Sequence, residues 1–249
     1  MQRYFMNEAY ENKAQYEASG EDFHHMIRVM RMSVGDQVYL AFSNQVTLIA
    51  EIVEVLEGQV LLKEIAKELQ DKEMPVQVTI ASGYPKGDKL DLIFQKSTEL
   101  GAHGLIGFPA KSSVVKWDDK KLAKKQQRLA KIVEEAAEQS HRQMVPEVTL
   151  YASSELFYQQ LANYDVVLVA YEESAKQGEK SQLASLLQTV KPGQRVLAVF
   201  GPEGGLTPKE IEKFVSANAK LCGLGPRILR CETAPLYLLS AASYQLELQ

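Results

Sequence analysis

The first seventy or so residues alternate between apolar and polar side chains. SVGDQVYLAF at 33–42 places a Gly-Asp turn before an alternating run, and QVTLIAEIVEVLEGQVLLKEI at 45–65 continues the alternation through a Glu-Gly break. A period of two is typical of half-buried β-strands. Short strands at this spacing predict a small barrel or sandwich. The charged stretch KELQDKEMP at 67–75 ends in proline and predicts a linker.

After this linker the pattern changes to strands that alternate with helices. Four apolar runs have the length of strands: PVQVTIAS at 75–82, LIGF at 105–108, DVVLVAY at 165–171 and RVLAVF at 195–200. The last two are apolar throughout, as central parallel strands are when both faces are buried. Apolar side chains at helical spacing predict helices over 87–102 and from about residue 119 to 140. The larger domain is therefore predicted to be α/β with a mostly parallel sheet.

Charge and composition narrow the class of protein. The chain has 249 residues, 45% of them apolar, and a formal net charge of −4. A protein that only coats nucleic acid would be basic, so any RNA contact must come from local patches. One candidate is HHMIRVMR at 24–31; the other is the run 111–142, with nine lysine or arginine residues against five acidic ones. On charge alone, the second run favours a solvated helix face over an RNA contact.

The cysteines and the apolar runs favour a cytoplasmic protein without a metal. Cys222 and Cys231 make no disulfide framework, and no paired Cys/His spacing surrounds them. The start MQRYFMNEAYENK lacks the charged head and apolar segment of an export signal. The apolar runs have strand length and are too short to cross a bilayer. No membrane partner is expected.

Candidate chemistry begins in the glycine-rich loop FGPEGG at 200–205, which follows a predicted parallel strand. Thr207, Pro208 and Glu210 have the types and spacing of an N-cap, a first helical residue and a capping-box partner. The loop therefore lies at the carboxyl end of a strand, where α/β sheets bind ligands. It has neither a phosphate-loop ending nor a dinucleotide fingerprint, which argues against an ATP- or NAD-using enzyme. Alone, it is as compatible with a tight turn as with a ligand site.

The second loop, LGPRILRCETA at 224–234, places arginines and a glutamate in an apolar, glycine-rich segment. Charges in such a setting need partners, and Ile228 and Leu229 between the arginines predict a loop pressed against the core. Two interpretations of Arg230 stand side by side. It pins the loop by pairing with Glu232 or Glu203, or it acts on a substrate.

Together, GPEGGLTPKEIE at 201–212 and LGPRILRCETAP at 224–235 strongly resemble the small-subunit ribosomal RNA uridine-N3 methyltransferases, the RsmE-like enzymes of the SPOUT class. Further stretches similar to the family's motifs are FHHMIRVMRMSVGD at 23–36, YPKGDKLDLIFQKSTELG at 84–101, KSSVVKW at 111–117 and EEAAEQSHRQMVP at 134–146. The match covers nearly the whole chain in order. It departs from the family at His141 and Cys231, where glycine and threonine are usual.

The resemblance implies a PUA-like RNA-binding β-barrel over 1–72 and an α/β SPOUT methyltransferase domain with a C-terminal trefoil knot over 73–249. It implies a homodimer that uses S-adenosylmethionine to methylate N3 of a uridine in 16S rRNA of the assembled small ribosomal subunit. The residues it implies for cofactor binding are Gly201, Pro202, Gly204, Leu224, Gly225, Arg227, Ile228, Leu229, Thr233 and Ala234.

The implied reaction sets the roles of further residues. N3 of uridine is a poor nucleophile until its proton leaves, so negative charge on the uracil must be stabilised. Arg230 is the first candidate for that stabilisation, Arg142 the second, and Glu203 is a candidate proton acceptor. The expected RNA-phosphate contacts are His24, His25, Arg28, Arg31, Lys86, Lys89 and Lys96. For Lys89 and Lys96, each taken separately, a solvated helix position is the favoured alternative. On a strand, the adjacent histidines would point to opposite faces, so at most one would face RNA.

Two alternatives to this function stay open. One is another SPOUT methyltransferase that acts on transfer RNA or on a ribose 2′-hydroxyl. The other is a non-catalytic RNA-binding assembly protein, which would not bind S-adenosylmethionine.

Overall fold

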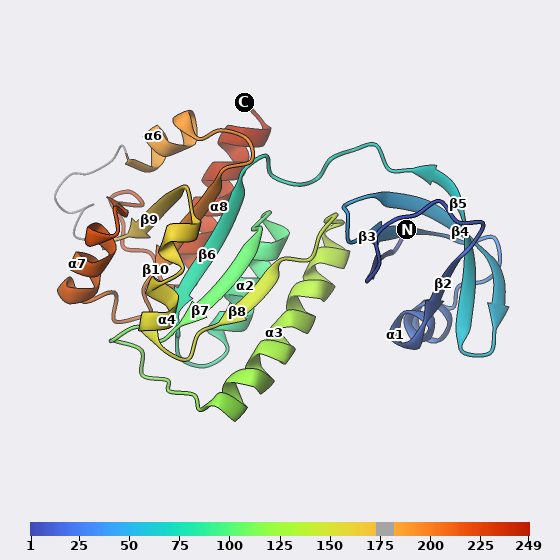
Figure 1. Ribbon diagram of the computed structural model, residues 1–249, viewed down its shortest axis with the longest axis horizontal. Helices are drawn as coiled ribbons and strands as arrows, with labels where there is room; N and C mark the ends of the chain where they lie inside the picture. The colour runs from blue at the N-terminus through green and yellow to red at the C-terminus, as the bar shows by residue number, and fades with distance from the viewer. Residues whose placement is uncertain (173–181) are drawn as a thin grey trace. The chain divides into compact units, whose positions relative to one another are not determined.

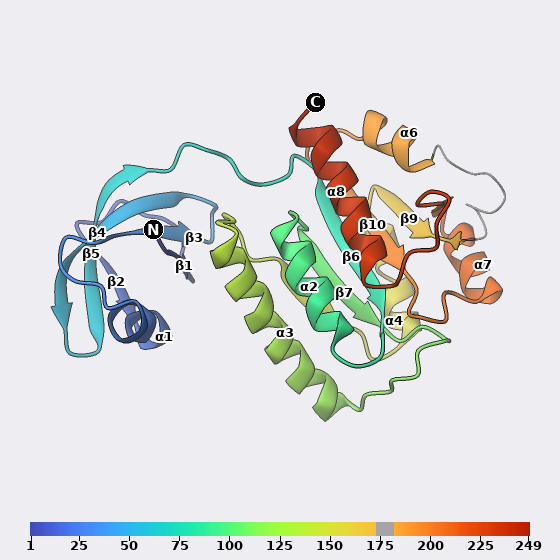
Figure 2. The ribbon, with the colours of Figure 1, turned by 180° about the vertical axis from the view of Figure 1, so that it is seen from behind.

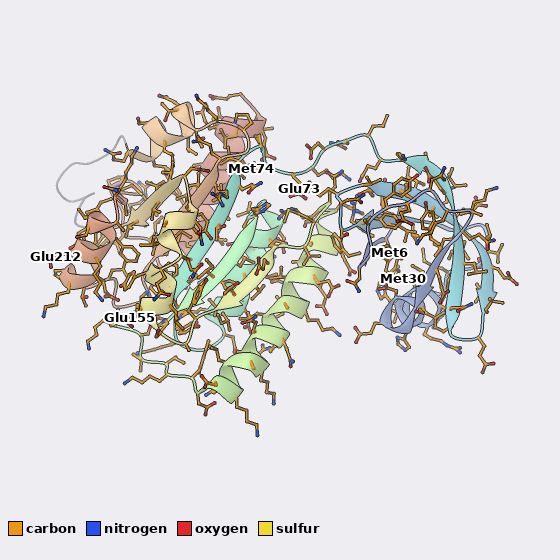
Figure 3. The ribbon with its side chains drawn as sticks, viewed as in Figure 1. Met6, Met30, Glu73, Met74, Glu155 and Glu212 are labelled. Atoms are coloured by element: carbon orange, nitrogen blue, oxygen red, sulfur yellow. The ribbon has the colours of Figure 1, made fainter. Side chains whose placement is uncertain are left out.

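A computed structural model describes residues 1–172 and 182–249, which divide into two compact units. The N-terminal unit comprises Met1–Glu73 together with Ala137–Val145, and the C-terminal unit comprises Met74–Ala136 and Pro146–Gln249. Glu73 and Met74, labelled in Figure 3, stand on either side of the first division, inside the linker predicted from sequence. The return of 137–145 to the N-terminal unit has no counterpart in the predicted boundary.

The N-terminal unit is built on one five-stranded sheet. Its strands are β1 (Arg3–Met6), β2 (Tyr16–Ser19), β3 (Gln37–Phe42), β4 (Thr47–Leu56) and β5 (Gln59–Lys67). They pair in the order β1-β3-β4-β5-β2, with β1 parallel to β3 and the other pairs antiparallel. Alternate side chains such as Val38, Leu40 and Ile52 are fully buried in its core. This order leaves β1 and β2 as edges, so among the described strands the predicted barrel is an open sheet.

The two adjacent histidines lie on a helical segment, and the expectation of a strand there is wrong. The elements are α1 (Gly20–Phe23) and η1 (His24–Val29), a short π-helix. Phe23, Met26 and Ile27 follow helical spacing and pack against the core of the unit. The helical spacing of these three apolar residues therefore favours a helix over a strand in this segment.

The C-terminal unit carries a six-stranded sheet in the order β11-β9-β10-β6-β7-β8. All its pairs are parallel, which confirms the predicted α/β class. Its strands are β6 (Gln77–Gly83), β7 (Gly104–Phe108), β8 (Glu147–Leu150), β9 (Val166–Ala170), β10 (Arg195–Phe200) and β11 (Lys220–Cys222). The described helices are α2 (Lys89–Glu99), α3 (Asp119–Gln139), α4 (Ser154–Tyr158), η2 (Leu161–Asn163), α6 (Gln182–Thr189), α7 (Pro208–Ser216) and α8 (Thr233–Glu247).

Both faces of this sheet are covered, which explains its unbroken apolar strands. Val167 and Leu197 point to one face and pack with Phe157 of α4 and Phe214 of α7. Figure 1 shows α4 in front of the sheet, and Figure 2 shows α2 and α8 in front of the opposite face. The predicted helices over 87–102 and 119–140 are confirmed as α2 and α3. Because the helices cover the two faces of the sheet, the loops that follow the strands gather at the edge formed by the carboxyl ends of the strands.

Candidate functional site

A pocket lies at the carboxyl edge of β9, β10 and β11. It has a volume of about 710 Å³ and is lined by Lys89, residues 170–172, 200–206 and 224–231, and Ala234. This size suits a small organic ligand, since such pockets span roughly 300–1,000 Å³. The loop after β10 and the loop after β11 both line it, although β9 lies between these two strands in the sheet.

The loop 201–206 is folded so tightly that two of its three glycines, Gly201 and Gly204, have no room for a side chain. A Cβ on Gly201 would stand 2.7 Å from the carbonyl carbon of Gly205, and a Cβ on Gly204 would stand 2.9 Å from Cβ of Ser112. A turn bond of 2.8 Å from the Gly205 N–H to the Pro202 carbonyl oxygen closes the loop. Main-chain groups therefore approach the pocket closely, without intervening side chains.

The predicted capping box after this loop is confirmed. The Glu210 carboxylate accepts the backbone N–H of Thr207 at 2.8 Å and its hydroxyl at 2.7 Å. The other carboxylate oxygen accepts the backbone N–H of Lys111 at 2.8 Å. One buried side chain thus fixes the start of α7 and ties it to the segment after β7.

Lys89, the first residue of α2, connects the two loops. Its Nζ lies 2.9 Å from Oε1 of Glu203 in the first loop and 3.5 Å from Oε2 of Glu232 in the second. The Cys231 thiol donates to the same Oε2 of Glu232 at 3.2 Å. The backbone N–H of Lys86 also donates to both Glu203 oxygens, at 3.2 and 3.3 Å. A single ammonium group therefore holds a carboxylate from each side of the pocket.

These contacts set the charge states at this side of the pocket. Burial acts to raise the pKa of Glu203, but its bonds with Lys89 and Lys86 outweigh burial, and the net pKa lies below the usual range. The pKa of Glu232 is also lowered, because its bonds with its own backbone and with Cys231, and the charge of Lys89, outweigh burial. Burial and the hydrogen bond to Glu232 raise the pKa of Cys231 to about 11. Near neutral pH the group is thus two carboxylates, one ammonium and one neutral thiol.

The pocket brings together most residues predicted to bind the cofactor. Those that line it are Gly201, Pro202, Gly204, Leu224, Gly225, Arg227, Ile228, Leu229 and Ala234. Thr233 does not line the pocket; it is the exposed first residue of α8, and its N–H donates to the Arg230 carbonyl oxygen at 2.9 Å.

The structure overturns two expectations about the second loop. Ile228 is 74% exposed and Leu229 is half-buried, so the loop is not pressed against the core. Within the described residues, the ion pairs of Glu203 and Glu232 are with Lys89, and no ion pair includes Arg230. The predicted Arg230–Glu pair is therefore wrong, because Lys89 already supplies the positive charge. Arg230 lines the pocket with an exposed side chain.

Arg142, the second catalytic candidate, lies in the N-terminal unit and does not line the pocket. Its side chain is 3% exposed, and Nε donates to Glu73 at 2.9 and 3.1 Å. The Gln143 N–H donates to the same carboxylate at 2.7 Å. These contacts fasten the returning segment 137–145 within its unit. They support a structural role, while the catalytic role stays a prediction.

The residues predicted to contact RNA phosphates have different surroundings. His24, Arg28 and Arg31 are exposed on the N-terminal unit, and Lys86 is exposed on the C-terminal one. His25 is half-buried, with Nδ1 3.0 Å from the Tyr4 hydroxyl. Lys96 pairs with Glu99 at 2.8 Å.

The position of Lys89 in the pocket was missed by sequence reasoning, which placed it on RNA. A signal for it existed: Lys89 follows β6, and the carboxyl ends of parallel strands meet at one edge, so it belongs at the same edge as the loop after β10.

In the described part of the chain, no group of three or more His, Cys, Asp or Glu side chains is arranged to hold a metal ion. Over the same residues, no helix combines the length and apolar character needed to cross a bilayer.

Comparisons with known proteins identify the class. Residues 72–243 match the family model of an RNA methyltransferase domain, and residues 18–65 match that of an RNA methyltransferase PUA domain. These matches identify an RNA methyltransferase domain joined to a PUA domain. The Bacillus subtilis ribosomal RNA small subunit methyltransferase E is 47% identical, covering 100% of this chain and 98% of the relative. This chain belongs to the ribosomal RNA small subunit methyltransferase E family.

Solved structures agree with this assignment. A crystal structure titled as that of an hypothetical protein is 44% identical and covers 99% of both chains, with a TM-score of 0.92. Lpg2936 of Legionella pneumophila, solved in complex with the bound cofactor SAM, is 27% identical with a TM-score of 0.82, covering 97% of this chain and 96% of its own.

Proposed function

We propose that this protein transfers a methyl group from S-adenosylmethionine to N3 of a uridine in the 16S rRNA of the small ribosomal subunit. The observation that carries the proposal is the pocket between the two glycine-rich loops. It combines close main-chain approach at 201–206 with an apolar and cationic second loop at 224–231. Membership of the methyltransferase E family and the cofactor bound to Lpg2936 support the same reaction.

The residues of the pocket fit S-adenosylmethionine. The glycines leave main-chain N–H and carbonyl groups free to approach a flat base and a ribose, and Leu224 and Leu229 offer apolar contacts to the adenine. The ionised carboxylates of Glu203 and Glu232 suit a ligand that carries a sulfonium charge. When bound, S-adenosylmethionine supplies an electrophilic methyl group.

Residues of this chain then have to manage charge and a proton on the uridine. Arg230 lines the pocket without an ion-pair partner among the described residues, so its guanidinium is free to donate to an oxygen of the uracil as negative charge develops. Glu203 is ionised and exposed on its loop, so its carboxylate is available to accept a proton, and its lowered pKa makes it a weak base. Arg230→Ala is expected to lower kcat while leaving the Kd of S-adenosylmethionine within about threefold. Unchanged turnover with bound cofactor would remove Arg230 from the mechanism.

The knot and the homodimer belong to this proposal. β11 pairs with β9 on the side away from β10, yet the residues that follow it line the same pocket as the loop after β10. A chain that passes under that loop would reach both places, which supports a trefoil knot. Exposed Tyr237, Tyr244 and Leu248 on or beside α8, with Ile228, support an interface with a second copy. A monomeric mass by light scattering in a fully active sample would refute the dimer.

Methyl transfer to the small subunit tests the function directly. Small subunits that lack the modification are incubated with labelled S-adenosylmethionine, and the labelled nucleoside is identified by mass spectrometry. Recovery of 3-methyluridine from 16S rRNA is expected, in keeping with a cytoplasmic enzyme that acts on ribosomal subunits. Label in a ribose-methylated nucleoside would assign the protein to another SPOUT activity. Absence of cofactor binding would favour a non-catalytic assembly protein.

A further inference from the structure

A row of lysines follows β7 and continues into the first two turns of α3. We call it the basic strip; its members are Lys111, Lys116, Lys120, Lys121, Lys124 and Lys125. All are exposed except Lys125, which is half-buried. They belong to the run 111–142, for which charge alone favours a solvated helix face over an RNA contact.

The strip repels itself in the free protein. Lys120 and Lys124, and likewise Lys121 and Lys125, stand four residues apart on one helix, where like charges are destabilising. They occupy the amino-terminal turns of α3, the end at which the helix dipole disfavours cations. Asp118 and Asp119 supply two acidic groups at this end, but the four lysines of these turns outnumber them, so the arrangement favours an anionic partner.

The strip is also not neutralised from nearby. Among the described residues, no ion pair includes any of its six ammonium groups. Of the two adjacent acidic residues, Asp118 accepts the backbone N–H of Lys121 at 2.8 Å and so caps the helix. Elsewhere on the same helix, Arg128 does pair with Asp91, which shows that α3 finds acidic partners where they are supplied.

An aromatic side chain is held rigidly among these lysines. Trp117 is half-buried, with its ring centroid 4.3 Å from that of Tyr84. Tyr84 is buried, and its hydroxyl donates to the carbonyl oxygens of Gly107 and Tyr151 at 3.1 and 2.8 Å. Lys125 Nζ lies 5.8 Å from the Trp117 centroid. Aromatic rings interleaved with cations bind single-stranded nucleic acid by base stacking and phosphate contact.

The strip begins beside the loop 201–206 that lines the pocket. The Ser112 hydroxyl donates to the carbonyl oxygen of Gly205, and Cβ of Ser112 is what a side chain on Gly204 would meet. The Lys111 N–H donates to Glu210, which caps the helix after the same loop. Figure 1 shows the connection from the end of β7 to the start of α3. A strand of RNA that lies along the strip is therefore brought to the loop that lines the pocket.

From these observations we infer that the basic strip binds the phosphates of a single-stranded RNA segment next to the target nucleotide, with a base stacked on Trp117. The inference rests on the proposed function, because it names a surface through which the RNA substrate reaches the same pocket. It adds a contact on the methyltransferase domain to those expected of the PUA domain.

The test compares two variants of equal charge change in the full-length protein. The strip variant is Lys116→Gln, Lys120→Gln, Lys124→Gln; the control is Lys191→Gln, Lys209→Gln, Lys220→Gln, at exposed lysines outside the strip. The Kd for unmodified small ribosomal subunits is measured at several salt concentrations. The slope of log Kd against log salt is expected to fall by about 2 for the strip variant, at about 0.7 per lost single-strand contact. The control is expected to keep the parent slope, and both variants the parent Kd for S-adenosylmethionine.

A separate variant, Trp117→Leu, is expected to weaken RNA binding at every salt concentration without changing the slope. Equal slopes for the strip variant and the control would overturn the inference while leaving the proposed function intact. Loss of S-adenosylmethionine binding in the strip variant would also overturn it, since the effect would then come from a damaged pocket. Failure of the parent protein to bind small subunits at all would refute both the inference and the proposed function.

Discussion

Gly201 offers the sharpest test of the pocket, because replacing it with alanine adds one carbon atom at a place without room. That Cβ would lie 2.7 and 2.9 Å from the carbonyl carbon and Cα of Gly205, and 3.0 Å from the nitrogen of Leu206. All three are main-chain atoms, so the loop itself has to move and no side chain can swing away. Overpacking of this kind costs about 1–3 kcal/mol. If the strain falls on the ligand-bound shape of the loop, affinity drops roughly 5- to 140-fold, at about 1.4 kcal/mol per tenfold.

The assay is the Kd of S-adenosylmethionine by calorimetry, with the thermal midpoint of unfolding measured in parallel. Gly87→Ala is the matched control, because Gly87 has a φ of +65° and open space around it, outside the residues that line the pocket. It is expected to lower the midpoint through backbone strain of about 1–2 kcal/mol while keeping the parent Kd. An unchanged Kd in Gly201→Ala, or an equal loss in the control, would refute the reasoning about the loop.

Three further predictions concern side chains. Arg142→Met leaves the Glu73 carboxylate without the Arg142 guanidinium and is expected to lower the free energy of unfolding by about 3–5 kcal/mol. Urea titration measures this free energy. A loss of turnover without a loss of stability would favour the catalytic role of Arg142 instead. Lys89→Met removes the shared partner of Glu203 and Glu232 and is expected to weaken S-adenosylmethionine binding, whereas Lys89→Arg keeps most of it. Parent affinity in the methionine variant would contradict a role of the Lys89 ion pairs in shaping the pocket. Cys231, with its pKa raised to about 11, should react with iodoacetamide at pH 8 on the order of a hundredfold more slowly than an ordinary thiol. Its reaction rate, followed by mass spectrometry, should still rise above pH 10. A plateau of that rate near pH 9 would show that burial leaves the pKa of Cys231 unshifted.

Local patterns in the sequence were enough to predict much of the fold. Alternation predicted β3 and β4, helical spacing predicted α2 and α3, and the order Thr207, Pro208, Glu210 predicted the start of α7. Each of these signals depends on neighbours within a few residues. The helical histidine segment was mispredicted although its signal, the spacing of Phe23, Met26 and Ile27, is equally local.

What the sequence could not supply were partners far apart in the chain. Arg230 and Glu232 are near neighbours in sequence, yet Glu232 pairs with Lys89 of another helix. That choice follows from the order of six strands, which brings the end of β6 beside the loop after β10. Arg142 likewise finds Glu73 across 69 residues, and nothing in either local sequence marks the pair.

The pairing of Glu73 with Arg142 has a consequence for how the protein is made. The ribosome delivers the last strand of the N-terminal sheet by residue 67, but the buried partner of Glu73 follows it only 69 residues later. At about 5–20 residues per second, roughly 3–14 s pass between the two. During that interval the Glu73 carboxylate of the nascent N-terminal unit lacks its arginine partner. Meanwhile β6, β7 and α3 of the C-terminal unit are being synthesised. The first unit to be synthesised is therefore finished only after much of the second has left the exit tunnel.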